Sequence, residues 1–125
     1  MKLVVMKFGG TSVGSIDKIN NVANIVEKQL NDKKLIVVLS AMSGVTNKMQ
    51  EYIDVIESNE IIENDLILTS GEAVSVGLLS AILKKRNIKS IPVTFAPNLA
   101  SGSQIIPPPQ PTSSIFKFLM SLFLI

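Results

Sequence analysis

The segment whose residue types could do chemistry is a glycine pair near the N-terminus, within Lys7-Phe8-Gly9-Gly10-Thr11-Ser12. It follows the apolar run of residues 3–6 and precedes an amphipathic segment that opens near Ser15. A strand, a glycine turn and a helix in this order present backbone N–H groups and a helix N-terminus to an anion. The lysine adds a positive charge, so the order predicts a phosphate site. Two adjacent glycines also fit a plain structural turn, and the segment is not a P-loop, which ends in Gly-Lys-Ser/Thr.

A second loop of small and hydroxylic residues, Ser40-Ala41-Met42-Ser43-Gly44-Val45-Thr46, follows the second apolar run of the chain. Ligands of open α/β sheets bind at the carboxyl ends of parallel strands, and both loops are expected at that edge. We therefore expect the two loops to face one cavity, with Ser40 and Gly44 available to a ligand. The alternative is a short turn between a strand and a helix, for which small residues are also suited.

The first 40 residues carry the pattern of a strand, a helix and a second strand. Residues 3–8 and 34–40 are short aliphatic runs, and the second is apolar on both faces, as a buried parallel strand requires. Between them, Ser15 is expected to cap a helix that ends at Asn31-Asp32. The apolar face of this helix is Ile16, Ile19, Val22, Ala23, Val26 and Leu30. The three elements predict a βαβ unit with a right-handed crossover.

The next part of the chain predicts two more helices and a strand. The apolar positions of residues 45–56 indicate an amphipathic helix with a buried stripe, and the acidic residues 57–65 a loop or short helix. Ser70-Gly71-Glu72 is expected to open the next helix, where Glu72 is a first-turn acid in the plainer interpretation. Residues 88–95 indicate a third strand, with Pro92 at an edge or an irregularity.

Composition excludes several classes of function. The 125 residues suit one domain, and a net charge of +2 does not indicate a nucleic-acid partner. The densest basic cluster, Lys84-Lys85-Arg86, is interpreted as the last turn of a helix, with Asn87 as a left-handed cap. The chain contains neither cysteine nor histidine, which removes thiolate nucleophiles, the usual zinc sites and a histidine general base. The first apolar run ends at Lys7, too short for an export signal, so we expect a cytoplasmic location and no membrane partner.

The character of the sequence changes after about residue 94. Residues 96–125 contain no acidic residue and a single lysine, with prolines at 107–109 and 111. The end, Ile115 to Ile125, is almost wholly apolar. We therefore predict a domain over residues 1–95 and a separate Pro-rich and apolar tail over 96–125.

Three motifs in order resemble the N-terminal part of bacterial aspartate kinases, which belong to the amino-acid kinase family. They are Lys7 to Val13, Leu39 to Asn47, and Thr69-Ser70-Gly71-Glu72. The resemblance implies an α/β fold, a partial three-layer α/β/α sandwich with three strands here and helices on both faces. It also implies transfer of the γ-phosphoryl group of ATP to the side-chain carboxylate of aspartate, the first step toward lysine, threonine and methionine.

Carried over residue by residue, the resemblance implies two groups of site residues. The catalytic Lys7 and the loop it opens would hold the ATP phosphates, through Lys7, Phe8, Gly9, Gly10, Thr11 and Ser12. Thr46 and Glu72 would bind aspartate. Mg²⁺ is expected through the nucleotide, and no metal ligands are expected in the chain itself. Since a carboxylate nucleophile is ionised at pH 7, this reaction needs no general base.

The resemblance covers residues 1–94, and aspartate kinases continue well beyond that length. The later Gly-Arg-Gly-Gly-Ser-Asp segment, the adenine-binding elements and the ACT domains that help to build the family's homo-oligomers have no counterpart here. We therefore expect a truncated or frameshifted sequence that is inactive alone. One alternative is a small non-catalytic α/β module that binds phosphate or a nucleotide. Another, based on the apolar tail, is a structural or interaction protein.

Overall fold

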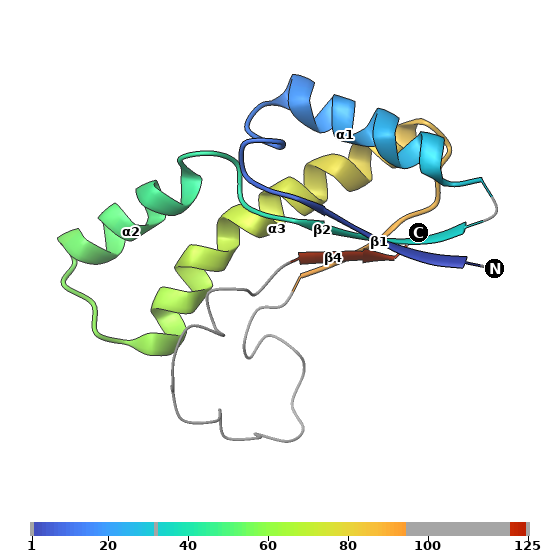
Figure 1. Ribbon diagram of the computed structural model, residues 1–125. Helices are drawn as coiled ribbons and strands as arrows, with labels where there is room; N and C mark the ends of the chain where they lie inside the picture. Colours follow the sequence, from blue (N-terminus) through green and yellow to red (C-terminus); the bar gives the residue numbers. More distant parts are fainter. Residues whose placement is uncertain (1, 32, 95–120, 125) are drawn as a thin grey trace, which may run out of the picture.

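The computed structural model describes residues 2–31, 33–94 and 121–124. Figure 1 shows the helices and strands of these residues, in which two helices lie between the second and third strands of the chain. In chain order the elements are β1 (Lys2–Phe8), α1 (Ile16–Gln29), β2 (Lys33–Leu39), α2 (Val45–Val55), α3 (Ile61–Lys85), β3 (Ile91–Val93) and β4 (Ser121–Leu124). The α/β class expected from the sequence is confirmed.

The strands form one sheet in the order β1-β2-β4-β3. β1 and β2 are parallel, in register from Lys2 opposite Lys33 to Phe8 opposite Leu39. β4 is antiparallel to both of its neighbours, so β2 and β3 run in the same direction. The expected three strands are therefore corrected to four, because residues 121–124 insert between the second and third. Pro92 lies on the edge strand β3, as predicted, where its missing N–H costs least.

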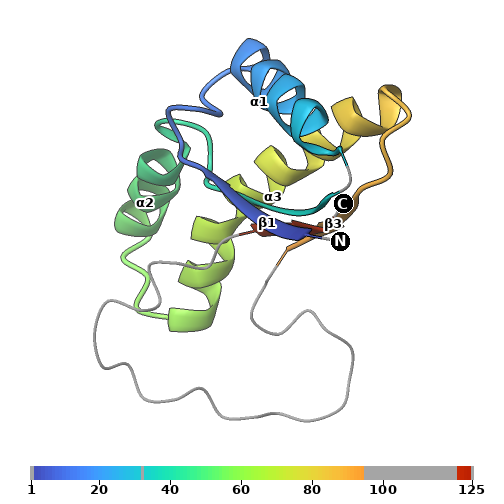
Figure 2. The same cartoon turned by 45° about the vertical axis from the view of Figure 1, so that its right-hand side comes forward.

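The connection from β1 to β2 through α1 and the connection from β2 to β3 through α3 step in the same direction across the sheet. Two right-handed connections of this kind place α1 and α3 on the same face. Figures 1 and 2 show these two helices lying against each other beside the strands. The core lies between them and β2. Its fully buried members are Val13, Ile19, Val22, Ala23, Val26, Leu35, Val37, Leu39, Val76, Leu79 and Leu83.

The other face of the sheet has no helix on it within the described residues. Along β1, side chains alternate: Val4 and Phe8 pack against the core, whereas Leu3, Val5 and Lys7 are exposed. The expectation of helices on both faces is thus not met here. The described residues form two layers of the sandwich, the sheet and one helical layer.

The ends of α1 follow the sequence signals closely. The Ser15 side chain accepts a hydrogen bond from the Lys18 N–H at 3.3 Å, which confirms the predicted N-cap. The helix ends at Gln29, just before the predicted Asn31-Asp32. Ile16 is the exception on the apolar face, because at the first helical position it is half exposed.

The helix α3 begins earlier than predicted, at Ile61, so Ser70-Gly71-Glu72 lies in its middle. A helix start at Ser70 was expected, and small polar residues do favour helix caps. Here the Ser70 hydroxyl instead donates to the carbonyl of Ile67 within the helix, at 2.7 Å. The interpretation of Glu72 as a first-turn acid is therefore wrong.

The far end of α3 forms a Schellman motif. The N–H of Ile88 donates to the carbonyl of Leu83, and the N–H of Asn87 to that of Lys84, both at 3.0 Å. Asn87 adopts the left-handed conformation with φ of 61°, as predicted. Lys84 and Lys85 occupy the last turn, which confirms the interpretation of the basic cluster as cations at a helix C-terminus.

Among the helices that the structure describes, α3 is long and apolar enough to cross a membrane by length and composition alone. A core helix of an α/β domain meets the same criterion. α3 packs on the sheet and on both other helices, and it buries Val76, Leu79 and Leu83 in the core. We interpret α3 as the central helix of the domain.

The predicted stripe of α2 is only partly buried. Ile53 is buried, whereas Tyr52 and Ile56 are more than half exposed. α2 contacts α3 and little of the sheet, so one flank of its apolar stripe faces outward. The proline run and residues 115–120 lie outside the described part of the chain.

Candidate active site

The two loops predicted to share a cavity lie against each other. The N–H of Ser40, which follows β2, donates to the carbonyl of Phe8 at 3.1 Å. A methyl group built on Gly10 would lie 2.8 Å from the carbonyl oxygen of Ala41. Only glycine therefore permits this approach of the first loop to the second. The two loops therefore meet at the carboxyl ends of β1 and β2, as expected. A cavity that both loops face stays a prediction.

The two glycines of the first loop have different surroundings. Gly10 is wedged against the second loop, whereas no atom lies within 4 Å of a methyl group built on Gly9. The turn closes by a hydrogen bond from the Ser12 N–H to the Gly9 carbonyl at 2.9 Å. Among backbone hydrogen bonds of the described residues, none is donated by the N–H of Gly10 or Thr11. These two donors and the open space at Gly9 can accept an anion at the loop.

The other residues of the first loop divide by their side-chain positions. Lys7 is exposed on β1, opposite Val38 of β2 and on the face away from the helices. Thr11 and Ser12 are exposed in the loop itself. Phe8 packs against the core, so this residue can meet a ligand only through its backbone.

Thr46 is the last residue of the predicted second loop, and in the structure it lies in the first turn of α2. Gly44 precedes this helix with φ of 83°, a left-handed conformation that favours glycine. Thr46 is exposed, and Ser40 is half-buried at the end of β2. The loop therefore presents the Thr46 hydroxyl near the carboxyl edge of the sheet.

Glu72 lies on α3, next to Gly71, which packs against Ala41 of the second loop and Val45 of α2. It is half-buried in an apolar stretch of α3, and this burial raises its pKa from the ordinary 4.5 to about 7. No side-chain hydrogen bond of Glu72 or Thr46 is found among the described residues. Both side chains can therefore serve a ligand.

Two further glycines permit close packing between elements, which the sequence pattern does not reveal. A methyl group on Gly14 would lie 3.3 Å from Cβ of Ser43, a second point at which the loops touch. One on Gly71 would lie 2.6 Å from Cγ1 of Val45, where α3 meets the start of α2. Gly71 precedes Glu72 in the third motif, but a helix-opening interpretation assigned it no packing partner.

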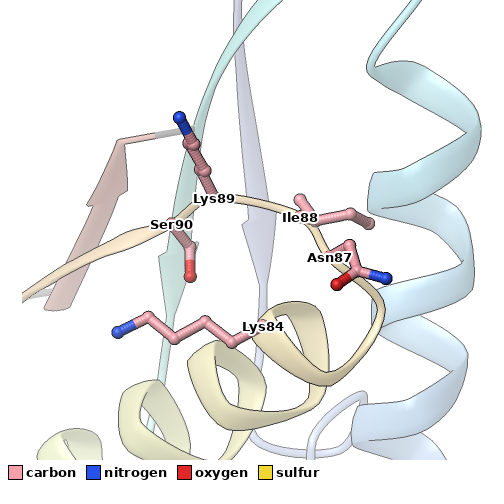
Figure 3. A pocket seen from close by; sticks show the side chains of 5 residues that line it. All are labelled: Lys84, Asn87, Ile88, Lys89 and Ser90. Atoms are coloured by element: carbon pink, nitrogen blue, oxygen red, sulfur yellow. The ribbon is translucent and has the colours of Figure 1, made fainter.

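A shallow cavity of about 350 Å³ lies elsewhere, at the C-terminal end of α3 (Figure 3). It is lined by Lys84, Asn87, Ile88, Lys89 and Ser90. These residues precede β3, which runs in the same direction as β2, so the cavity is at the opposite edge of the sheet from the two loops. In Figure 3 the amino groups of Lys84 and Lys89 point in different directions. No predicted site residue lines this cavity.

The described residues contain no cluster of three or more side chains suited to hold a metal ion. The lysine and the backbone donors of the first loop suit an anion, and the carboxylate of Glu72 suits an ammonium group. The candidate site can thus bind a phosphorylated molecule and a small amine side by side.

Comparison with known proteins shows the family to which a chain with this fold and candidate site belongs. The family model described as the amino acid kinase family matches residues 2–106. The chain belongs to the amino acid kinase family. The match extends past residue 95, the predicted domain boundary, which stays a prediction.

Within that family, the proteins it is similar to are aspartate kinases. It is 42% identical to an aspartate kinase of Pseudomonas fluorescens, over 84% of this chain and 25% of the relative. It is 39% identical to an aspartokinase of Rickettsia felis, over 72% of this chain and 24% of the relative. The chain thus spans about a quarter of the length of these relatives.

Solved structures agree. The crystal structure of aspartate kinase from Synechocystis superposes with a TM-score of 0.65 at 35% identity, covering 70% of this chain and 15% of that one. E. coli aspartokinase III in complex with aspartate and ADP superposes with a TM-score of 0.54 at 26% sequence identity. The match covers 71% of this chain and 30% of that one. The fold is therefore that of the amino acid kinases, over the segment that the chain shares with them.

Proposed function

We propose that this chain carries the phosphate- and aspartate-binding part of an aspartate kinase, which transfers the γ-phosphoryl group of ATP to the side-chain carboxylate of L-aspartate. The observation that supports this best is the contact between the two loops. It gathers an open glycine, two backbone donors and an exposed lysine at the carboxyl edge of the sheet. An aspartate- and ADP-bound structure among the similar proteins supports the choice of ligands.

The first loop takes the nucleotide in this proposal. The N–H groups of Gly10 and Thr11 donate to phosphate oxygens, and Gly9 leaves room for the phosphate to approach the backbone. Lys7 neutralises charge that spreads over the transferred group, with Phe8 and Ser12 completing the loop. Mg²⁺ enters only with the nucleotide phosphates.

Aspartate binds beside it, across the start of α2 and the middle of α3. The Glu72 carboxylate, when ionised, faces the substrate ammonium group. The Thr46 hydroxyl donates a hydrogen bond to a polar group of the substrate or accepts one from it. The substrate's side-chain carboxylate is already ionised near neutral pH. Alignment and charge neutralisation therefore suffice, and a general base is not needed.

The extent of activity is part of the proposal. Because the chain spans about a quarter of its relatives, we propose that it binds both ligands and does not turn them over alone. The reaction would begin the route to lysine, threonine and methionine, in the cytoplasm. The division into a domain over residues 1–95 and a non-family tail over 96–125 also remains a proposal, with residues 121–124 of that tail paired into the sheet of the domain. Homo-oligomer formation of the kind the family uses is proposed as well.

An ATP- and aspartate-dependent hydroxamate assay on the purified chain, paired with binding titrations, tests this function. We expect binding of ATP and of aspartate, loss of ATP binding in Lys7→Ala, and no hydroxamate. Turnover that Lys7→Ala abolishes would show that the chain is a complete kinase. ATP binding without aspartate binding would favour the non-catalytic nucleotide module, and binding of neither would refute the proposal.

A further inference from the structure

The contact between α2 and α3 is unusually close at one point. Gly71 is buried in the middle of α3 and lies against Val45, the first residue of α2, and Ala41 of the second loop. A methyl group built on Gly71 would lie 2.6 Å from Cγ1 of Val45 and 3.0 Å from Cβ of Ala41. Real Cβ atoms essentially never approach a heavy atom within 3.0 Å. Any side chain here must push the two elements apart.

The neighbouring atoms have little freedom to give way. Val45 is β-branched and stiff at χ1, so its Cγ1 cannot swing aside as the end of a long side chain would. One turn further along α2, Sδ of Met49 lies 3.6 Å from the Ser70 hydroxyl oxygen, whose proton is donated to the carbonyl of Ile67. The two helices therefore touch at two adjacent residues of α3, Gly71 against Val45 and Ser70 against Met49.

The residues on either side of this contact are the two proposed ligands of aspartate. Thr46 follows Val45, and Glu72 follows Gly71. The separation of α2 and α3 at Gly71 thus sets the distance between the hydroxyl and the carboxylate. We propose that Gly71 is a positioning residue, whose missing side chain holds Thr46 and Glu72 at the spacing that aspartate binding requires. This inference rests on the proposed function.

The test compares aspartate and ATP binding in four forms of the full chain. They are the wild type, Gly71→Ala, Gly77→Ala, and the double variant Val45→Ala/Gly71→Ala. Gly77 is the matched control, because it lies on the exposed side of the same helix with no atom within 4 Å of an added methyl group. The double variant removes the Cγ1 atom that the added methyl group would meet.

We expect Gly71→Ala to raise the aspartate dissociation constant about tenfold or more, as a small displacement of a binding group does. Its ATP dissociation constant should stay within about twofold of the wild type, because the closest clash of the added methyl group is with Val45 of α2, whereas the first loop meets Ala41 at its carbonyl oxygen, away from the Cβ atom that faces Gly71. Gly77→Ala should leave both constants unchanged. The double variant should recover most of the lost aspartate affinity, which a merely destabilising change would not do.

The outcomes separate the inference from the function on which it rests. A wild-type chain that binds no aspartate refutes both. A wild type that binds aspartate, with folded Gly71→Ala binding it equally well, overturns the inference alone, as does equal loss of ATP binding. If circular dichroism shows that Gly71→Ala does not fold, Val45→Ile replaces it as a milder overpacking of the same contact. Unchanged aspartate binding in folded Val45→Ile would then overturn the inference.

Discussion

The two faces of the sheet differ sharply, although the same strands build both. On the helical face Val37 of β2 is fully buried beneath α1 and α3. On the other face Val5 of the edge strand β1 is 63% exposed, whereas Val38 of β2 is buried. The contiguous core of the described residues therefore lies on the helical side. The open side carries Lys7, at the end of β1 where the two loops meet. Along β1 itself, Val4 and Phe8 pack against the core and Lys7 is exposed, so alternate residues of this strand serve the fold and the proposed chemistry.

The largest expected effect is on stability, and it should separate the two faces. Val37→Ala removes two buried methyl groups and should lower the free energy of unfolding by about 2–3 kcal/mol, measured by urea denaturation. Val5→Ala is the same change on the open face and should cost less than about 0.5 kcal/mol. Equal losses would mean that the open face is covered as well as the helical one.

The glycines of the first loop should show the same contrast between packed and open positions. Gly10→Ala places a methyl group 2.8 Å from a backbone oxygen that cannot move aside, and should cost about 1–3 kcal/mol of stability. It should also weaken ATP binding by displacing the loop. Gly9→Ala has free space and should leave stability nearly unchanged. A Gly9→Ala variant as unstable as Gly10→Ala would contradict the structure of the loop.

The pH dependence of aspartate binding should report on Glu72. With a pKa of about 7, its carboxyl group is mostly protonated at pH 6 and mostly ionised at pH 8. The affinity for aspartate should therefore rise about tenfold between these values, measured by calorimetric titration. In Glu72→Gln the affinity should be low and nearly independent of pH. A flat profile in the wild type would remove Glu72 from the site.

The same group should affect stability with the opposite sign. Because the pKa of Glu72 is raised in the folded state, its protonated form favours folding. This contribution is fully present below the ordinary pKa of 4.5 and is lost as the pH rises through about 7. The free energy of unfolding should fall over that range more in the wild type than in Glu72→Gln. Equal slopes would show that folding leaves the pKa of this carboxyl unchanged.

The smallest expected effect is a gain. Gly77 lies within α3 on the exposed side, where alanine is compatible with the helix and meets no neighbour. Gly77→Ala should raise the free energy of unfolding by about 0.5–1 kcal/mol. A loss of stability would reveal a contact at this position that the described residues do not show.

Much of the fold was predictable because its signals are local. The aliphatic runs of β1 and β2, the Ser15 cap and the left-handed Asn87 each depend on a few adjacent residues. The convergence of the loops followed from one general property of parallel strands. Local pattern alone was sufficient for these features.

The features that could not be predicted depend on distant contacts. The start of α3 was misplaced because Ser70 resembles a cap until its hydroxyl is seen to bond within the helix. The packing role of Gly71 depends on Val45, which is 26 positions away in the sequence. Likewise, β4 joins the sheet through pairing with β2 and β3, which its own residues do not reveal. The roles of the predicted site residues still await experiment.

In the proposed function, the two converging loops bind the phosphates of a nucleotide. Its most direct test is titration of the ¹⁵N-labelled chain with ATP and Mg²⁺, followed through the backbone amides. The largest shifts are expected at Gly10 and Thr11, and they should be lost in Lys7→Ala. Shifts confined to the cavity at Lys84, Lys89 and Ser90, or no saturable shifts at all, would contradict it.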